Sequence, residues 1–397
     1  MRDLTILNLA LYSPDFSSNF GESLLKLGKE LKLRKGKLIV CFPEFKDWMN
    51  IFKINDIPVE IVPIRRVFDF NAIKLVVKLV KKYNITIIHT HFGIETQVIA
   101  CISKWLCKRN TGEPLAQKIV WHWRNPIRTE IISDDAKGIK KILLEIKKLS
   151  GNLFYRFLDR HFVTTNIVIS SSIKSMLLKR KLIPECKIEI IPNGIDLESY
   201  NVDNVEDIRK GFSISRDTIL IGNISNFRPQ KDHFTFLEAI RIVLEKHPKS
   251  MFILVGDGPN RLKAEKYADS LGIRQNLIFT GVQGDIKPFI KACNFTVLSS
   301  FYEGFGNVIC ESMALERPVI ATNVGGITDI IVDNENGFLV PLKSPEIMAE
   351  KMVRLIIHPE EVEHFGKNGR RLIEKRFTIQ IWTQSIISLY LKMIKIK

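Results

Sequence analysis

Short apolar runs alternate with stretches of helical spacing along the chain. Amphipathic helices are predicted at residues 23–33 and 73–83, where apolar positions recur three and four residues apart. Strands are predicted from the apolar runs at residues 4–9, 38–42 and 85–89. Strands that alternate with helices form a parallel sheet with helices on both faces, so the first half predicts an α/β domain.

The pattern restarts after a turn marked by Pro192, Asn193 and Gly194. Six further strands are predicted at residues 219–224, 251–255, 277–279, 295–298, 319–321 and 338–340. We therefore expect an α/β fold of two tandem, doubly wound Rossmann-like domains, at residues 1–193 and 194–397. Ligands of such sheets bind outside the carboxyl ends of the strands, which predicts a cleft between the domains. A final helix at about 379–394 belongs to the second domain or crosses back to the first.

The pattern with the most specific chemistry joins Glu303 to Glu311 through Gly304, Phe305, Gly306 and Asn307. A strand precedes this segment, and a helix is predicted to begin near Gly306. Small residues at a strand-to-helix turn let backbone N–H groups approach an anion, and the helix dipole favours negative charge there. The two carboxylates can accept hydrogen bonds from sugar hydroxyls. An isolated pair of glutamates at this spacing would more simply be solvated, but its surroundings favour a ligand site.

A second polar segment follows the strand predicted at 219–224. It contains Asn226, Arg228 and Lys231. An Arg and a Lys at a strand end can bind a diphosphate and balance the charge that develops on it as it departs. Alone, the two cations would more simply lie exposed on a loop. Further glycines follow other strands of this half, at 256, 258, 281, 325 and 326.

In the first half, His89 and His91 lie at and just after the end of the strand predicted at 85–89, and His122 and Arg124 follow another strand predicted at 118–120. His91 can hydrogen-bond a sugar hydroxyl, whereas His89 could equally be satisfied by backbone. Arg124 can pair with an acceptor phosphate or carboxylate. Two histidines two residues apart have no evident third ligand, so we predict no metal site.

Composition excludes several classes of protein. The chain has 397 residues, of which 45% are hydrophobic, enough for two domains with full cores. It has no apolar run of the roughly 18 residues that a membrane span needs and no secretory signal. Six cysteines without a C-x-x-C pair suit a reducing compartment. We expect a cytoplasmic protein, with peripheral contact to the inner face of the cell membrane.

The expected membrane contact rests on charge. Residues 1–196 carry 33 Lys and Arg against 19 Asp and Glu, which accounts for +14 of the total net charge of +16. Residues 137–158 predict a helix with an apolar face and a crowd of lysines, a pattern that suits an anionic membrane surface. The alternatives are a solubilising basic surface and a core helix whose lysines face solvent.

The ordered set of motifs resembles the family 4 retaining glycosyltransferases of the GT-B fold, the group 1 glycosyl transferases. The resemblance runs from about residue 190 to the C-terminus. It rests on the segments 191–196, 226–231, 256–259, 303–311, 317–322, 325–326 and 336–340. In the first half, His91 matches the family's cleft histidine. Residues 17–21 read Ser-Ser-Asn-Phe-Gly where the family often has a Gly-Gly loop, and Asn226 stands where it commonly has an Arg.

The resemblance implies a role for each site residue. Lys231, with Arg228 or Asn226, would bind the donor diphosphate, and Glu311 would bind the ribose. Glu303 would hold the transferred sugar together with the backbone of residues 304–307. His91 and Glu303 would be catalytic, and Gly21 and Arg124 would contact substrate.

We therefore expect a metal-independent, retaining hexosyltransferase that needs no cofactor. Its substrates would be a nucleotide sugar and a saccharide, presumed to be lipid-linked, in cell-surface polysaccharide assembly. Another nucleotide-sugar enzyme such as an epimerase, a basic nucleic-acid-binding protein and an inactive nucleotide-sugar sensor are the alternatives. The chain has no nucleic-acid-binding module and no basic pattern interleaved with aromatic residues, so we expect no nucleic-acid partner.

Overall fold

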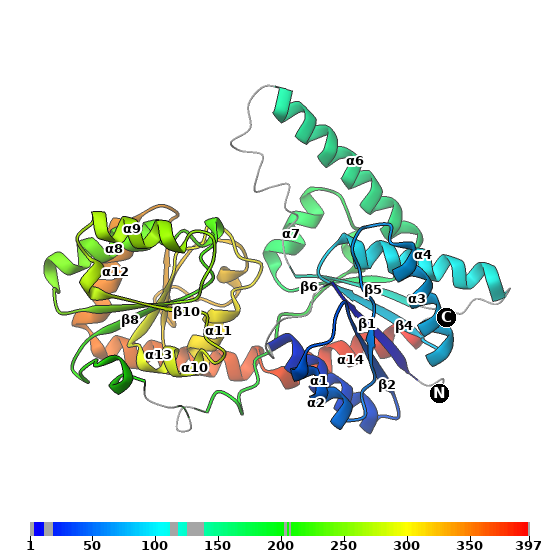
Figure 1. Cartoon of the computed structure of the whole chain (residues 1–397), viewed down its shortest axis with the longest axis horizontal. Coiled ribbons are helices and arrows are strands. Elements are labelled where there is room, and N and C mark those ends of the chain that lie inside the picture. The colour runs from blue at the N-terminus through cyan, green and yellow to red at the C-terminus, as the bar shows by residue number, and fades with distance from the viewer. Residues whose placement is uncertain are drawn as a thin grey trace. The chain divides into compact units, whose positions relative to one another are not determined.

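The computed structural model describes residues 4–11, 19–111, 118–124, 139–201, 205 and 208–395. Within these ranges the side chains of residues 19, 109–111, 139–149 and 395 are not described. The chain divides into two compact units (Figure 1). Unit 1 comprises residues 1–194 together with 379–397, and unit 2 comprises residues 195–378.

Unit 1 contains a parallel sheet of seven strands in the order β3-β2-β1-β4-β5-β6-β7. Its strands are β1 (Thr5–Ala10), β2 (Lys37–Phe42), β3 (Val59–Ile61), β4 (Ile87–His91), β5 (Lys118–Trp123), β6 (Thr165–Val168) and β7 (Ile188–Ile190). Its helices are α1 (Asn19–Leu33), α2 (Asn50–Ile54), α3 (Phe70–Tyr83), α4 (Ile94–Thr111), α6 (Ile139–His161), α7 (Ser171–Lys179) and α14 (Ile379–Lys395).

Unit 2 contains a parallel sheet of six strands in the order β10-β9-β8-β11-β12-β13. Its strands are β8 (Leu220–Ile224), β9 (Met251–Val255), β10 (Leu277–Gly281), β11 (Phe295–Leu298), β12 (Val319–Thr322) and β13 (Gly337–Val340). Its helices are α8 (His233–Lys246), α9 (Arg261–Ser270), α10 (Lys287–Ala292), α11 (Asn307–Ala314), α12 (Pro345–Ile357) and α13 (Pro359–Arg376). The prediction of two doubly wound α/β domains is confirmed.

The last helix completes the core of unit 1. Trp382, Ile386 and Tyr390 of α14 lie in one buried cluster with residues of β1, β2 and α1, such as Ile6 and Leu27. The sequence left the placement of this helix open between the two domains. Its apolar face is buried on the first sheet, although unit 2 lies between α14 and the rest of unit 1 in the sequence.

Two strands of unit 1 extend beyond their predicted ends. β4 runs to His91 and β5 runs to Trp123. The sequence interpretation placed His91 and His122 after the ends of these strands, and this was wrong. Buried polar residues can belong to a strand, but in the sequence they interrupt the apolar run from which the strand is predicted.

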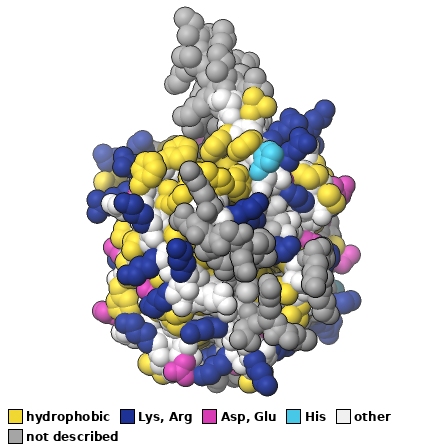
Figure 2. Space-filling view, turned by 90° about the vertical axis from the view of Figure 1, so that its right-hand side faces the viewer, with side chains coloured by type: hydrophobic (Ala, Val, Ile, Leu, Met, Phe, Trp, Pro, Cys, Tyr) yellow, Lys and Arg dark blue, Asp and Glu magenta, His cyan; other side chains and the backbone are white. Residues whose placement is uncertain are grey.

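The helix predicted at 137–158 is α6, although its lysine-rich face lies outside the described side chains, as do Asp134 and Asp135. No helix among the described residues has both the length and the apolar window that crossing a membrane requires. Figure 2 shows Lys and Arg side chains spread over one face of the molecule, with few Asp and Glu among them.

Candidate active site

The centre of the unit 2 sheet brings the two predicted donor motifs together. β8 and β11 are neighbours, and the chain leaves β8 for β9 on one side and β11 for β12 on the other. Loops that diverge from such a switch point leave a crevice at the carboxyl ends of the strands. Lys231 lies in the loop after β8, and Glu303 lies in the loop after β11.

Lys231 and Glu303 form a close ion pair. The Lys231 Nζ to Glu303 Oε1 distance is 2.5 Å, and the two side chains are 15% and 11% exposed. The Ser300 hydroxyl donates a second hydrogen bond of 2.7 Å to the same carboxylate oxygen. The sequence interpretation missed Ser300, because a serine at a strand end has no distinguishing spacing. The pair places a cation and an anion at one point of the crevice, both partly accessible to a ligand.

The backbone of the Glu303 loop is held by two glycines from the loop after β12. Gly326 donates its backbone N–H to the Glu303 carbonyl at 3.0 Å. A Cβ added to Gly326 would lie 2.3 Å from the Gly304 carbonyl oxygen, and one added to Gly325 would lie 2.0 Å from that of Glu303. Only glycine permits this approach, since the colliding atoms belong to the backbone.

Gly326→Ala is expected to move the Glu303 loop and lower turnover by about 10²-fold, because misplacing a site by about 1 Å costs that much. The rate of sugar transfer and the midpoint of thermal unfolding would both be measured. Gly211→Ala is the matched control, since its added Cβ would meet nothing within 4 Å. Equal activity of the two variants would contradict this role of Gly326.

The segment between the two glutamates is arranged around the start of α11. The helix begins at Asn307 with Gly306 as its N-cap residue, as predicted. Phe305 is only 2% exposed and packs edge-on against Phe377, with ring centroids 5.6 Å apart. Its side chain therefore anchors the loop, and only the backbone here can meet a ligand. Glu311 is 8% exposed on α11.

Asn226 and Arg228, the other two residues predicted to bind the donor diphosphate, do not take part in this ion pair. The side chains of Asn226 and Arg228 are exposed in the loop after β8 and form no side-chain hydrogen bond among the described residues. The base of this loop is rigid. The Ser225 hydroxyl lies 3.0 Å from His233 Nε2, and the His233 ring stacks on Phe227 at 4.0 Å. Burial lowers the pKa of His233 to about 3, so the ring is neutral at pH 7.

In unit 1 the switch point lies between β1 and β4. His91 is the last residue of β4, and Gly21 lies in the first turn of α1, the helix that follows β1. Phe20 packs edge-on against the His91 ring, with centroids 4.9 Å apart. The structure thus brings His91 and the start of α1 together. The N–H groups of a first helical turn have no partner within the helix, so Gly21 can offer its backbone to a ligand.

Three histidines share one face of β4 and β5. The His89 and His91 rings stack at 4.2 Å, and His89 Nε2 lies 3.2 Å from His122 Nδ1. The Tyr390 hydroxyl of α14 lies 2.6 Å from His89 Nδ1. Burial lowers the pKa of His89 to about 3 and holds the pKa values of His91 and His122 well below 6.5. All three rings are therefore neutral at pH 7.

These histidines supply the third ligand that the sequence interpretation could not find. Ring nitrogens of His89, His91 and His122 lie within 4.8 Å of one another, close enough to hold a metal ion. However, both ring nitrogens of His89 already have hydrogen-bond partners. The Arg124 guanidinium, 3.3 Å from His91 Nδ1, also repels a cation. A hydrogen-bonded network fits this donor set better than a metal centre does.

Arg124 is fixed by its neighbours in unit 1. Its Nε donates to His91 Nδ1 at 3.3 Å, and its Nη1 donates to Asn193 Oδ1 at 2.9 Å. The guanidinium also lies over the rings of Phe20 and Phe92, at 4.8 and 5.2 Å. Because His91 Nδ1 accepts this bond, the neutral ring carries its proton on Nε2. Arg124 therefore sets the tautomer of His91 rather than standing free for an acceptor anion.

Arg124→Met is expected to release this tautomer and to raise the pKa of His91, since the nearby positive charge is lost. The ¹⁵N shifts of the His91 ring would report it, and the Nδ1 signal should move at least halfway toward the protonated position. Arg124→Lys keeps the positive charge, so the pKa of His91 should stay low. Without the guanidinium, however, the His91 ring should no longer be held in a single tautomer. An unchanged His91 spectrum in Arg124→Met would refute the role of this arginine.

Two protein-family models match the chain, one for each half. "Glycosyltransferase Family 4" matches residues 23–199, and "Glycosyl transferases group 1" matches residues 204–372. Together they cover β2 to β13, which includes the switch point of unit 2.

Two curated relatives are named as glycosyltransferases. The Staphylococcus aureus capsular polysaccharide biosynthesis glycosyltransferase CapM is 30% identical over 58% of this chain, which spans 62% of that protein. An Escherichia coli UDP-Gal:alpha-D-GlcNAc-diphosphoundecaprenol alpha-1,3-galactosyltransferase is 27% identical, over 82% of this chain and 80% of its own.

Solved structures share the fold. Anabaena HepE in complex with UDP-glucose superposes with a TM-score of 0.80 at 19% identity, covering 98% of this chain and 100% of its own. A glycosyltransferase from Rickettsia africae gives 0.78 at 19% identity, with complete coverage of both chains. With both sheets, both switch points and both family matches in agreement, this chain belongs to the family 4, group 1 glycosyltransferases of the GT-B fold.

Proposed function

We propose that this glycosyltransferase moves a sugar from a nucleotide-sugar donor to a lipid-linked saccharide acceptor, with retention at the anomeric carbon. The product would contribute to a cell-surface polysaccharide. Unit 2 would bind the donor and unit 1 the acceptor. We propose that the reaction needs no cofactor and no metal, because protein cations balance the charge of the leaving diphosphate.

The observation that carries this proposal is the Lys231–Glu303 pair at the switch point of unit 2. The Lys231 ammonium would donate to the diphosphate, aided by Arg228 and Asn226, and a fixed cation stabilises the departing group most in the transition state. The Glu303 carboxylate would accept hydrogen bonds from the transferred sugar, beside the backbone of Gly304–Asn307. Glu311 would accept hydrogen bonds from the ribose.

His91 of unit 1 would take part through its Nε2–H. That atom is buried and has no hydrogen-bond partner in the described structure. A buried N–H group without a hydrogen-bond acceptor costs free energy unless a ligand supplies the acceptor. We propose that a sugar hydroxyl is that acceptor. In the retaining reaction that we propose, the leaving phosphate oxygen accepts the proton of the attacking hydroxyl on the same face of the sugar.

The acceptor class draws support from two sources. The E. coli relative is named for an acceptor carried on diphosphoundecaprenol. Residues 1–196 are strongly basic, which suits a phosphate-bearing acceptor and the anionic surface of the cytoplasmic leaflet. We therefore propose peripheral contact with the inner face of the membrane. HepE, named with UDP-glucose, supports a nucleotide-sugar donor.

A thermal-shift screen over UDP-, GDP-, ADP- and dTDP-sugars tests the donor. A ligand at 100 times its dissociation constant stabilises the folded state by about 2.7 kcal/mol, which is readily measured. Transfer of labelled sugar to a lipid-linked acceptor in EDTA then separates this function from that of an epimerase, which would isomerise the donor instead. Anomeric NMR of the product reports retention or inversion. Stabilisation by no nucleotide sugar would overturn the proposal.

A further inference from the structure

An open groove lies on unit 1 between the C-terminal half of α6 and the segment that leads from α7 to β7. Its volume is about 800 Å³, within the range of roughly 300–1,000 Å³ that is usual for ligand sites. The lining residues are Leu153, Arg156, Phe157, Asp159, Arg160, His161, Leu178, Lys181, Leu182, Ile183, Pro184, Glu185 and Lys187.

One side of the groove is apolar and open to solvent. Leu153 and Phe157 are one helical turn apart on α6, and they are 56% and 54% exposed. Leu182 and Ile183, which are nearly buried, line the groove as well. Large exposed apolar side chains that border a groove are typical of a site that binds an apolar group.

The charges around the groove are unbalanced. The side chains of Arg156, Arg160 and Lys181 are exposed and form no hydrogen bond or ion pair within the described part of the chain. Both lining acids are already paired. Glu185 pairs with Lys174 at 2.7 Å, and Asp159 pairs with Lys187.

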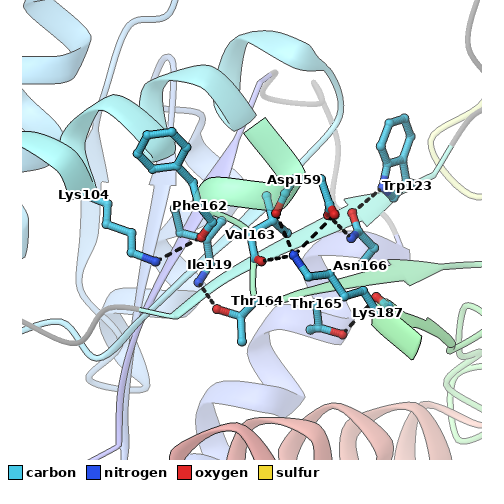
Figure 3. A network of polar contacts seen from close by, with 10 residues as sticks. All are labelled: Lys104, Ile119, Trp123, Asp159, Phe162, Val163, Thr164, Thr165, Asn166 and Lys187. Atoms are coloured by element: carbon cyan, nitrogen blue, oxygen red, sulfur yellow. Dashed lines mark hydrogen bonds and ion pairs between the residues drawn. The ribbon is translucent and has the colours of Figure 1, made fainter. Parts of the chain in front are cut away.

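Lys187 is fully engaged and therefore adds no free charge. Its ammonium donates to the Asp159 carbonyl at 2.7 Å, to the Asp159 carboxylate at 3.3 Å and to the Val163 carbonyl at 2.9 Å (Figure 3). The Asp159 carboxylate also accepts from Asn166 Nδ2 at 2.7 Å. This network fixes the base of the groove and leaves three cations at its rim.

We propose that this groove binds an anionic phospholipid of the bilayer. One hydrocarbon chain would lie along Leu153, Phe157 and Ile183, and the phosphate would pair with Arg156, Arg160 and Lys181. An apolar groove with three free cations and no free acid complements such a lipid in both shape and charge.

The position of the groove favours a bilayer lipid over the lipid-linked acceptor. His161 and Lys187 precede β6 and β7, so the groove lies at the amino edge of the sheet. His91 lies at the carboxyl edge, and a five-residue strand separates the edges by roughly 15 Å. The groove is therefore an anchor and not the place where the reacting sugar binds.

This inference rests on the proposed function only in requiring a membrane near the enzyme. The test uses the full chain and vesicles of 30% phosphatidylglycerol in phosphatidylcholine, at low salt. Arg156→Gln, Arg160→Gln and Lys181→Gln together should weaken vesicle binding about 100-fold, since each cation near an anionic surface contributes about fivefold. Lys29→Gln, Lys74→Gln and Lys81→Gln together remove the same charge elsewhere on unit 1 and should weaken it far less.

A second variant tests the apolar side. Leu153→Asn with Phe157→Asn should abolish binding of monomeric short-chain phosphatidylglycerol, whereas glycerol phosphate alone should not bind the wild type. Equal losses in the two triple variants would overturn the proposal. Binding of polyprenyl phosphate, without any binding of phosphatidylglycerol, would also overturn it and assign the groove to the acceptor's carrier.

The same variants separate this inference from the proposed function. Each should retain the thermal shift with the donor sugar, and each should transfer sugar to a water-soluble acceptor at the wild-type rate. If no donor sugar raises the unfolding temperature of the wild type, that result counts against the proposed function. The lipid measurement can still be interpreted.

Discussion

Lys231→Ala is expected to lower the rate of sugar transfer by about 10³-fold. Removing one preorganised group that stabilises developing charge costs about 10²–10³-fold in turnover. Here the Glu303 carboxylate also loses its 2.5 Å partner and keeps only the Ser300 hydroxyl. Steady-state rates with the donor found in the thermal-shift screen would measure the loss.

A double-mutant comparison distinguishes catalysis from simple stability. Glu303→Gln removes the charge that Lys231 balances, so Lys231→Ala should destabilise the protein less in that background. The loss of turnover should persist, because the diphosphate would still lack its cation. Lys246→Ala, at an exposed position on α8, is the control and should be active. Near-normal turnover in Lys231→Ala would refute the diphosphate role.

Unit 1 is expected to lose stability between pH 7 and pH 5, by about 2 kcal/mol from His89 alone. The folded-state pKa values of His89, His91 and His122 are lowered by burial, to about 3 for His89. In the unfolded chain these rings take up protons below about pH 6.5, whereas the folded state does not. The unfolded state then binds more protons, so stability falls as pH falls, and the lowered pKa values of His91 and His122 add to the loss from His89 in the same direction.

Tryptophan fluorescence can follow this loss in unit 1 alone. All five tryptophans lie in unit 1, at residues 48, 105, 121, 123 and 382. Denaturant titrations at pH 7 and pH 5 would give the two free energies of unfolding. His122→Asn should reduce the difference, whereas His161→Gln, at an exposed position, is the control. A stability that is flat over this range would show that the buried rings are protonated in the folded state.

The sequence predicted that the segments of Lys231 and Glu303 follow strands of the second sheet, and the structure places them there. Glu303, Lys231 and the glycines lie after strands, and the carboxyl ends of parallel strands converge. Local spacing therefore carries most of the information about this site. What it could not predict is the direct contact between Lys231 and Glu303, which depends on β8 and β11 being neighbours although β9 and β10 separate them in the sequence.

The histidine network was beyond local reasoning for a different reason. Tyr390 meets His89 across 301 positions of sequence, and a tyrosine within an apolar helix looks like any other core residue. His91 and His122 are polar residues buried within strands. Because strands were predicted from apolar runs, both strands were ended too early. Arg124 was predicted to contact the acceptor, whereas its partners Asn193 and Phe20 show only in three dimensions.

The place of α14 in unit 1 has a consequence for how the chain folds as it is synthesised. A ribosome makes about 5–20 residues per second, so the 184 residues of unit 2 (195–378) delay α14 by roughly 10–40 seconds after Gly194 emerges. Throughout this interval the face of the first sheet that Trp382, Ile386 and Tyr390 will cover has no partner. Unit 2 can fold during the delay, so the nascent chain completes its second domain before its first.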